Sequence, residues 1–142
     1  MSNYHLNHIN IRTTDLDGTR DFYANVFGLE EGFRPTFPTP GYWMYAGDTP
    51  IVHISPSDPD SPARTNPDGM GDGLDHFAMW GSGLDDQMAT LERYGIEYNK
   101  LLVADGRVVQ LFFKDPNGAA IELGFDSEVE GVTAENFDGE IW

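Results

Sequence analysis

The sequence has no cysteine and few cations, and both shortages narrow what the protein can do. Without cysteine it has no disulfides and no thiolate ligands for a metal. Lys and Arg number 8 against 24 Asp and Glu, which gives a formal net charge of −16. This charge repels nucleic acid phosphates and anionic membrane surfaces, so we expect neither as a partner.

Long apolar runs are missing as well. No stretch approaches the roughly 20 residues of a membrane-spanning helix, and the polar start, residues 1–5, lacks the apolar core of a signal peptide. We therefore expect a cytoplasmic protein. With 142 residues, 39% of them hydrophobic, the chain is long enough to bury a proper core.

The sequence does contain a doubled pattern. His8 and His76 each open a strand-like segment and stand 68 positions apart (76 − 8); His53 and Glu122 lie in later strand-like segments and stand 69 apart (122 − 53). After each opening histidine come an amphipathic stretch that ends at a glycine and then β-type runs separated by turn residues. This period is longer than that of solenoid repeats, so it indicates one duplicated βαβββ unit.

The pattern sets the expected element boundaries. The spacing predicts helices over 15–27 and 84–94, with Asp15 and Ser82 as N-caps. The expected strands follow their helices at 30–35, 42–46, 51–55, 97–103, 107–113 and 119–125, with turns at 47–50, 105–106 and 115–118. Module 1 spans about 5–55, a Pro/Gly/Asp-rich linker 56–74, and module 2 about 75–125. The acidic tail 126–142 is expected to be solvated surface, because chain ends are seldom ordered unless they are tied down.

Strand parity places the four doubled side chains on one kind of face. Alternate residues of a strand face opposite sides, so His8 shares a face with Asn10 and Arg12, away from the apolar side that a helix covers. The same parity holds for His53, His76 and Glu122 in their own strands. A curved sheet with its helices outside would point all four into its hollow.

Three imidazoles and a carboxylate predict a metal site. These donors suit divalent Fe, Mn, Ni, Co or Zn. A single strand histidine is more often a hydrogen-bonded core residue than a ligand, so the joint placement carries the prediction. Glu122 strengthens it, because a carboxylate between Ile121 and Leu123 is costly to bury unless a cation is close by.

The chain resembles the vicinal oxygen chelate superfamily, which includes glyoxalase I, methylmalonyl-CoA epimerase, extradiol dioxygenases, and the fosfomycin and bleomycin resistance proteins. The resemblance covers about residues 5 to 125. It is carried by these segments: His8-Ile9-Asn10-Ile11, Asp15-Leu16-Asp17, Phe22-Tyr23, Gly28-Leu29, Asp75-His76-Phe77-Ala78, Phe113-Lys114-Asp115-Pro116-Asn117-Gly118 and Ile121-Glu122-Leu123.

The resemblance implies an α+β fold in which paired βαβββ modules form an open eight-stranded, barrel-like sheet with helices outside. It implies one divalent metal held by His8, His53, His76 and Glu122, and a small-molecule substrate that chelates the metal through two neighbouring oxygens. Among these residues, Glu122 and His53 are the expected catalytic groups. A homodimer is expected, because modules in this superfamily also pair between two chains.

Three functions follow from the resemblance. Glyoxalase I-like lyase or isomerase chemistry is favoured, with Arg12 as a carboxylate anchor, although that enzyme has Glu or Gln where this chain has His53. An extradiol ring-cleaving dioxygenase is the first alternative, but its tyrosine is replaced by Phe113, and residues 104–106 lack its histidine. A metal-free binding protein of the bleomycin-resistance kind is the second.

The remaining clues concern the substrate. Trp80 shares the face of His76, and we expect it to contact a flat or apolar group. Asn10 and Arg12 share the face of His8, and Arg34 is a further cation for an anionic group. Salt bridges to the abundant carboxylates are an equally good explanation of both arginines.

Overall fold

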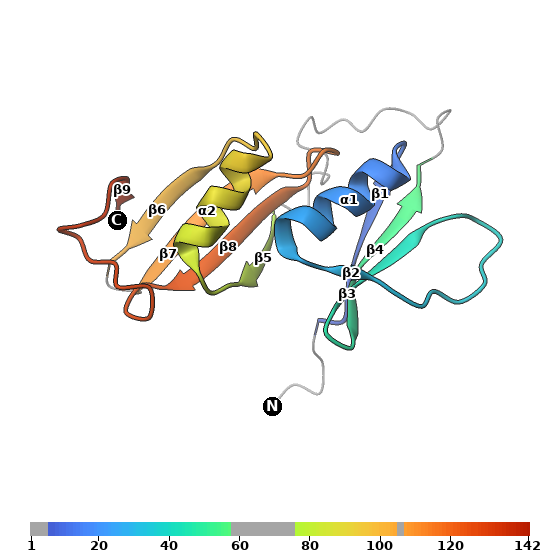
Figure 1. Ribbon diagram of the computed structural model, residues 1–142, viewed down its shortest axis with the longest axis horizontal. Coiled ribbons are helices and arrows are strands. Elements are labelled where there is room, and N and C mark those ends of the chain that lie inside the picture. The colour runs from blue at the N-terminus through green and yellow to red at the C-terminus, as the bar shows by residue number, and fades with distance from the viewer. Residues whose placement is uncertain (1–5, 58–75, 105–106) are drawn as a thin grey trace. The chain divides into compact units, whose positions relative to one another are not determined.

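The computed structural model describes residues 6–57, 76–104 and 107–142, and the chain divides into two compact units, Met1–Ala63 and Arg64–Trp142. Each unit contains the expected order βαβββ, to which the second unit adds one more strand, so the α+β fold class is confirmed (Figure 1). The described strands form two open sheets, one of four strands and one of five. Most of the predicted linker, and the turn at 105–106, lie outside the described residues. No described helix is long and apolar enough to cross a membrane.

The first unit has a four-stranded mixed sheet with one helix on it. Its elements are β1 (Ile9–Thr13), α1 (Leu16–Phe27), β2 (Glu30–Glu31), β3 (Tyr42–Ala46) and β4 (Thr49–Pro56). The strand order is β1-β4-β3-β2, with β1 parallel to β4 and the other neighbours antiparallel.

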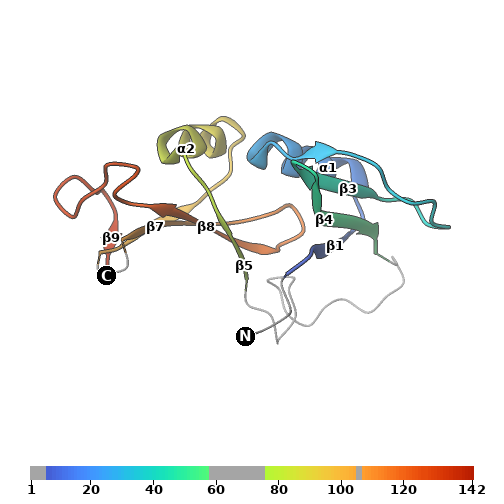
Figure 2. The same cartoon turned by 90° about the horizontal axis from the view of Figure 1, so that it is seen from below.

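Helix α1 begins and ends as predicted. The Asp15 side chain accepts a hydrogen bond from the backbone N–H of Gly18, and Gly28 ends the helix in a left-handed conformation with φ 66. The helix buries Tyr23 and Val26, and it packs on the face of the sheet that carries the apolar side chains (Figure 2). The core of this unit is completed by Ile11, Leu29, Met44, Val52 and Ile54. This packing leaves the other face of the sheet for the polar residues of β1 and β4.

Strand β2 is much shorter than the predicted run 30–35, since it contains only Glu30 and Glu31. Prolines 35, 38 and 40 follow it, and proline has no N–H to give to a sheet. The chain therefore leaves the sheet as a loop over residues 32–41 and returns at Tyr42.

The second unit has a five-stranded mixed sheet under one helix. Its elements are β5 (Phe77–Trp80), α2 (Leu84–Arg93), β6 (Asn99–Val103), β7 (Val108–Lys114), β8 (Ala120–Asp126) and β9 (Glu140–Ile141). The strand order is β5-β8-β7-β6-β9, and α2 lies on one face of this sheet in both views (Figures 1 and 2). The predicted N-cap Ser82 is wrong: Gly83 is the cap, and the Glu130 carboxylate accepts hydrogen bonds from the backbone N–H groups of Gly83 (2.8 Å) and Leu84 (2.9 Å).

The tail 126–142 is ordered, contrary to the expectation of solvated surface. Its end forms β9, which pairs in parallel with β6 and becomes the fifth strand of the sheet. The backbone N–H of Trp142 donates to the Leu102 carbonyl at 2.8 Å, and the N–H of Ala104 donates to the Trp142 carbonyl at 3.0 Å. The tail is ordered because it satisfies backbone groups at the edge of the sheet, which its acidic composition does not indicate.

Candidate metal and substrate site

The polar face of the first sheet contains the residues that parity assigned to it. In β1, Ile11 and Thr13 are buried, while Asn10 and Arg12 are exposed on the opposite face. His8 directly precedes the strand on that same face. In the parallel pairing, Asn10 lies across from His53 of β4. The hydroxyl of Ser55 donates to the Asn10 side-chain oxygen at 2.8 Å, which leaves the Asn10 amide group to donate elsewhere.

His53 lies in the middle of an aromatic stack. Its ring centroid is 3.8 Å from that of His8, with an interplanar angle of 13°, and 4.0 Å from that of Trp43, with an angle of 9°. Trp43 comes from β3, where it is the register partner of His53. The sandwich leaves His53 only 9% exposed. The two histidines of the first unit are therefore neighbours, and one is fixed between flat surfaces.

The Nε2 atom of His53 is buried and has no hydrogen-bond partner among the described residues. The Pro50 carbonyl accepts a hydrogen bond from the ring, and we assign that bond to Nδ1 because Nε2 has no partner. Burial is the main cause that lowers the pKa of His53; nearby His8 and Arg34 lower it further, while the bond to Pro50 acts in the opposite sense. A neutral ring with Nδ1–H held by a carbonyl presents a lone pair at Nε2, as a metal-ligating histidine does.

The second unit brings His76 and Glu122 together. His76 Nε2 lies 3.0 Å from Glu122 Oε2, and the Gln110 amide donates to Glu122 Oε1 at 2.6 Å. The Glu122 side chain is 17% exposed, while that of His76 is 40% exposed. Gln110 was missed from the sequence, although its alternation with buried Val109 and Leu111 in β7 places it on the polar face. The carboxylate is thus fixed by two neighbours on its own sheet.

A tight turn sets the position of Glu122. The buried Asp115 side chain accepts hydrogen bonds from the backbone N–H groups of Asn117 (2.8 Å) and Ala119 (2.9 Å). Gly118, with φ 82, allows the chain to reverse there. This turn joins β7 to β8 and fixes their register, in which Phe112 pairs with Glu122. The Asp-Pro-Asn-Gly segment thus determines where the carboxylate stands.

The two pairs are equivalent in their units. In the first unit β1 runs parallel to β4, and in the second unit β5 runs parallel to β8. In each unit the opening histidine stands two positions before the residue that pairs with the other metal-binding side chain. Asn10 is the partner of His53, and Ala78 is the partner of Glu122. In either unit taken by itself, the described residues gather only such a pair, and no group of three or more metal-binding side chains is found among them. The donor set, three imidazoles and one carboxylate, fits a divalent transition metal.

The predicted substrate contacts belong to different units. Trp80 is 76% exposed and lies over Gly124, where a Cβ atom would come 3.1 Å from the ring. Gly124 therefore makes room for a flat aromatic surface on the polar face of the second sheet. In the first unit, Arg12 lies across from Ser55, and Arg34 lies in the loop that precedes β3.

A family model described as the Glyoxalase/Bleomycin resistance protein/Dioxygenase superfamily matches residues 5–123. The chain belongs to this superfamily. The match covers both units and includes all four doubled side chains. The resemblance found in the sequence is thus confirmed, while the roles of the individual site residues stay predictions.

Several members of the superfamily are similar to this chain. Glyoxylase I 4 of Arabidopsis thaliana is 29% identical over 121 residues, which are 83% of this chain and 68% of the relative. A putative glyoxalase family protein from Bacillus anthracis has 24% identity and a TM-score of 0.67, covering 89% of this chain and 99% of its own. A variant of the fosfomycin resistance protein FosX from Listeria monocytogenes, complexed with Mn(II) and 1S,2S-dihydroxypropylphosphonic acid, has 20% identity and a TM-score of 0.66, covering 95% and 96%. These two structures support the fold.

Proposed function

We propose that this member of the superfamily is a divalent-metal-dependent enzyme with glyoxalase I-like lyase or isomerase chemistry. Its two units form one domain over residues 1–125 around one metal, whose ligands are His8, His53, His76 and Glu122. The substrate is a small molecule with two neighbouring oxygens. The observation that carries the proposal is the buried Nε2 of His53, for which the described parts of the chain provide no hydrogen-bond partner.

The free-energy cost of burying Nε2 of His53 without a hydrogen bond supports its role as a metal ligand. A buried polar atom without a hydrogen bond costs about 1–3 kcal/mol, and native proteins seldom accept this cost without a functional reason. A divalent cation bound at Nε2 removes it. The contact between His76 and Glu122 gives the second unit a matching imidazole and a carboxylate. The Mn(II) complex of FosX, with the same fold, is consistent with a metal in such a protein.

The bound metal supplies Lewis acidity to the two substrate oxygens. The protein side chains then move the protons and hold the substrate. Glu122, oriented through Oε1 by Gln110, takes a proton from carbon next to the substrate carbonyl. Glu122 then returns the proton to the neighbouring carbon, while His53, kept neutral by burial, would hold the metal through the lone pair of its Nε2.

Side chains of both polar faces contact the substrate in this proposal. Arg12 and the amide of Asn10 bind oxygens at the first sheet, where both are exposed. Trp80, lying flat over Gly124, covers an apolar part of the substrate at the second sheet. Contacts of these two kinds, a few polar groups beside apolar rings, are typical of small-molecule sites.

The two other functions are less well supported. An extradiol dioxygenase would use His8, His76 and Glu122, and its tyrosine position holds Phe113, which is buried in the core and has no hydroxyl. A metal-free binding protein would have no use for the buried imidazole of His53 in the first unit or for the His76–Glu122 pair in the second. We therefore place both behind the lyase or isomerase.

The test is metal binding followed by activity. Full-length protein is stripped with chelator and reconstituted anaerobically with Fe, Mn, Ni, Co or Zn, and each form is assayed with methylglyoxal hemithioacetal and with catechol. We expect one metal per chain and turnover of the hemithioacetal only. Glu122→Gln should abolish turnover and weaken metal binding, whereas Glu128→Gln, which alters an exposed carboxylate of the same unit, should change neither.

Wild-type protein that binds no metal would refute the proposal. Turnover of catechol alone would replace the lyase or isomerase with the dioxygenase.

A further inference from the structure

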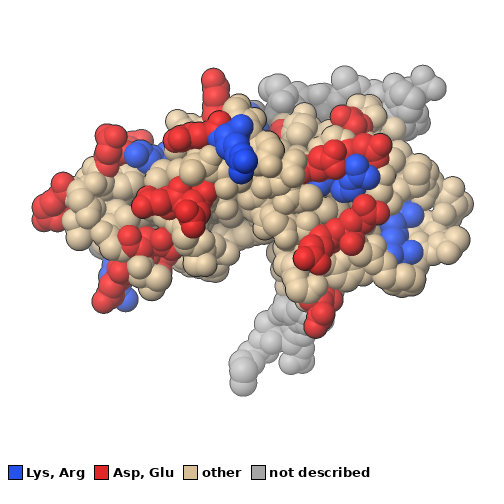
Figure 3. Space-filling model, in the orientation of Figure 1, with Lys and Arg blue, Asp and Glu red and all other residues tan. Residues whose placement is uncertain are grey.

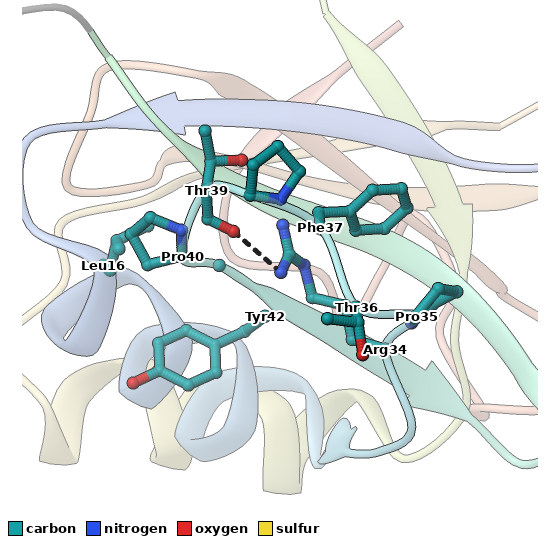
Figure 4. Close-up of a pocket in the computed structure, with 10 residues that line it drawn as sticks. Leu16, Arg34, Pro35, Thr36, Phe37, Thr39, Pro40 and Tyr42 are labelled. Atoms are coloured by element: carbon teal, nitrogen blue, oxygen red, sulfur yellow. Dashed lines mark hydrogen bonds between the residues drawn. The ribbon is translucent and has the colours of Figure 1, made fainter.

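The loop that separates β2 from β3 lines an open cavity of about 490 Å³ in the first unit. Its walls are Leu16, Tyr42 and the loop segment 34–41, which contains three prolines (Figure 4). Prolines fix the backbone, so a loop of this composition can hold a shape without being part of a sheet. Nothing in the proposed metal chemistry uses this cavity.

Arg34 lies in this cavity, and no acidic side chain of residues 6–57, 76–104 or 107–142 pairs with it. The structure gives it no ion pair among the described residues, although the chain has 24 acids. Acidic side chains are spread over both units on the face shown in Figure 3, and basic ones are few. Arg20 shows the contrast, because it has ion-pair contacts with Asp17, Asp21 and Glu31. A cation that lacks a partner in so acidic a protein is available to an anion from outside.

The guanidinium of Arg34 is positioned rather than loose. Its Nη1 donates to the Thr39 carbonyl at 3.0 Å, and its central carbon lies 4.8 Å from the centroid of the Phe37 ring. Its Nε is buried and has no hydrogen-bond partner in the part of the chain that the structure describes. At Gly41 a Cβ atom would come 3.1 Å from Nη2, so glycine lets the backbone approach the guanidinium closely. Figure 4 shows the guanidinium turned back into the loop toward Thr39.

A row of rings connects Arg34 with the histidine pair. Arg34 lies over Phe37, the Phe37 and Trp43 ring centroids are 6.1 Å apart, and Trp43 is stacked on His53. Phe37 is the ring of this row that also lines the cavity, so a flat group attached to an anion held by Arg34 would lie beside Phe37.

We infer that the 34–42 loop is a carboxylate subsite in which Arg34 binds the acid group of an aromatic or otherwise flat apolar substrate. A carboxylate is favoured because its two oxygens match the planar donors of a guanidinium, and because the ring of Phe37 in the cavity wall suits a flat group next to it. That the bound molecule is the substrate rests on the proposed function. Its binding at Arg34 does not.

The test uses metal-free, full-length protein, with benzoate as the probe and the uncharged benzamide as its matched comparison. Binding is followed by saturation-transfer NMR and by chemical-shift titration. We expect benzoate to bind at least tenfold more tightly than benzamide and than inorganic phosphate. Arg34→Gln should weaken benzoate binding at least tenfold, and Arg93→Gln, which removes an exposed cation in the other unit, should leave it unchanged.

A structural role for Arg34 gives a different result. If Arg34 only supports the loop, Arg34→Gln lowers the melting temperature and affects benzoate and benzamide alike. If Arg34→Gln does not fold, Arg34→Lys carries the test: it keeps the charge but not the planar fork, so benzoate binding should weaken while its preference over phosphate is lost. Equal binding of benzoate and benzamide, or unchanged binding by the folded Arg34 variants, would overturn the inference.

Metal titration of the same samples separates the two proposals. Arg34-dependent benzoate binding in a protein that takes up no metal would keep the subsite and reject the enzyme. Metal uptake without benzoate binding would keep the metal-dependent enzyme and reject the Arg34 subsite.

Discussion

Replacing His53 with phenylalanine should stabilise the metal-free protein and prevent its stabilisation by metal. Phenylalanine is flat and close to histidine in size, so it can keep the stack between His8 and Trp43. The substitution removes the buried Nε2, which has no partner, together with the hydrogen bond to the Pro50 carbonyl. These two losses have opposite effects on the free energy of unfolding.

Removing the buried Nε2 should raise the free energy of unfolding by about 1–3 kcal/mol, and losing the hydrogen bond to the Pro50 carbonyl should lower it by about 1 kcal/mol. The net gain for metal-free His53→Phe is therefore about 0–2 kcal/mol. For a chain of this size about 3 °C corresponds to 1 kcal/mol, so the melting temperature should rise by about 0–6 °C. Metal at 100 times its dissociation constant stabilises a protein by about 2.7 kcal/mol, or about 8 °C here. The His53→Phe variant should lose most of this metal-induced shift. Without metal the variant should therefore melt at the higher temperature, and in excess metal the wild type should.

Thermal unfolding followed by circular dichroism, with chelator and with excess metal, measures both effects. Trp43→Phe is the matched control, because it alters the same stack without removing a ligand and should keep the metal-induced shift. A variant that retains the full metal-induced shift would show that His53 is not a ligand. A metal-free variant less stable than the wild type by more than about 2 kcal/mol would show that Nε2 has a partner in solution.

Three further outcomes are expected. Glu130→Ala should destabilise the protein by about 1–2 kcal/mol in chemical denaturation, because it leaves two N–H groups of the α2 terminus without a partner; the exposed neighbour Glu128→Ala should cost under about 1 kcal/mol. Gly124→Ala should displace the ring of Trp80, seen as a shift in tryptophan emission, and an unchanged spectrum would contradict the contact. Folding lowers the pKa of His53, so this side chain binds fewer protons in the folded state than in the unfolded state. The free energy of unfolding of the metal-free protein should therefore fall as the pH drops below about 6.5. His53→Phe should remove that part of the pH dependence, which paired melting curves can check.

The sequence allowed the helices and the polar faces to be predicted because their signals are local. Asp15 and Gly28 bound α1 through contacts within a few residues. Strand alternation needs no knowledge of the partner strand, so His8 was assigned to the polar face from its immediate neighbours. The Asp115 turn likewise is formed by bonds within four residues.

Features that depend on distant residues were missed. The cap of α2 comes from Glu130, 46 residues after Leu84, so Ser82 was the natural local choice. The stack around His53 depends on register between strands, and its partnerless nitrogen depends on which atoms are close in space. Composition suggested an unordered tail, because the backbone edge to which β9 binds is not visible in the tail sequence itself.

Strand β9 also affects how copies of the protein behave toward one another. An uncovered strand edge offers backbone donors and acceptors to any passing chain and is a common start of aggregation. By occupying the outer side of β6, residues 140–142 keep that edge from pairing with a second molecule. In the first sheet the outer strand β2 has only two residues, both glutamates, whose charge discourages such pairing. Loss of the last few residues would thus leave a chain prone to self-association, even though they lie at the opposite edge of the sheet from β5, the strand that follows His76.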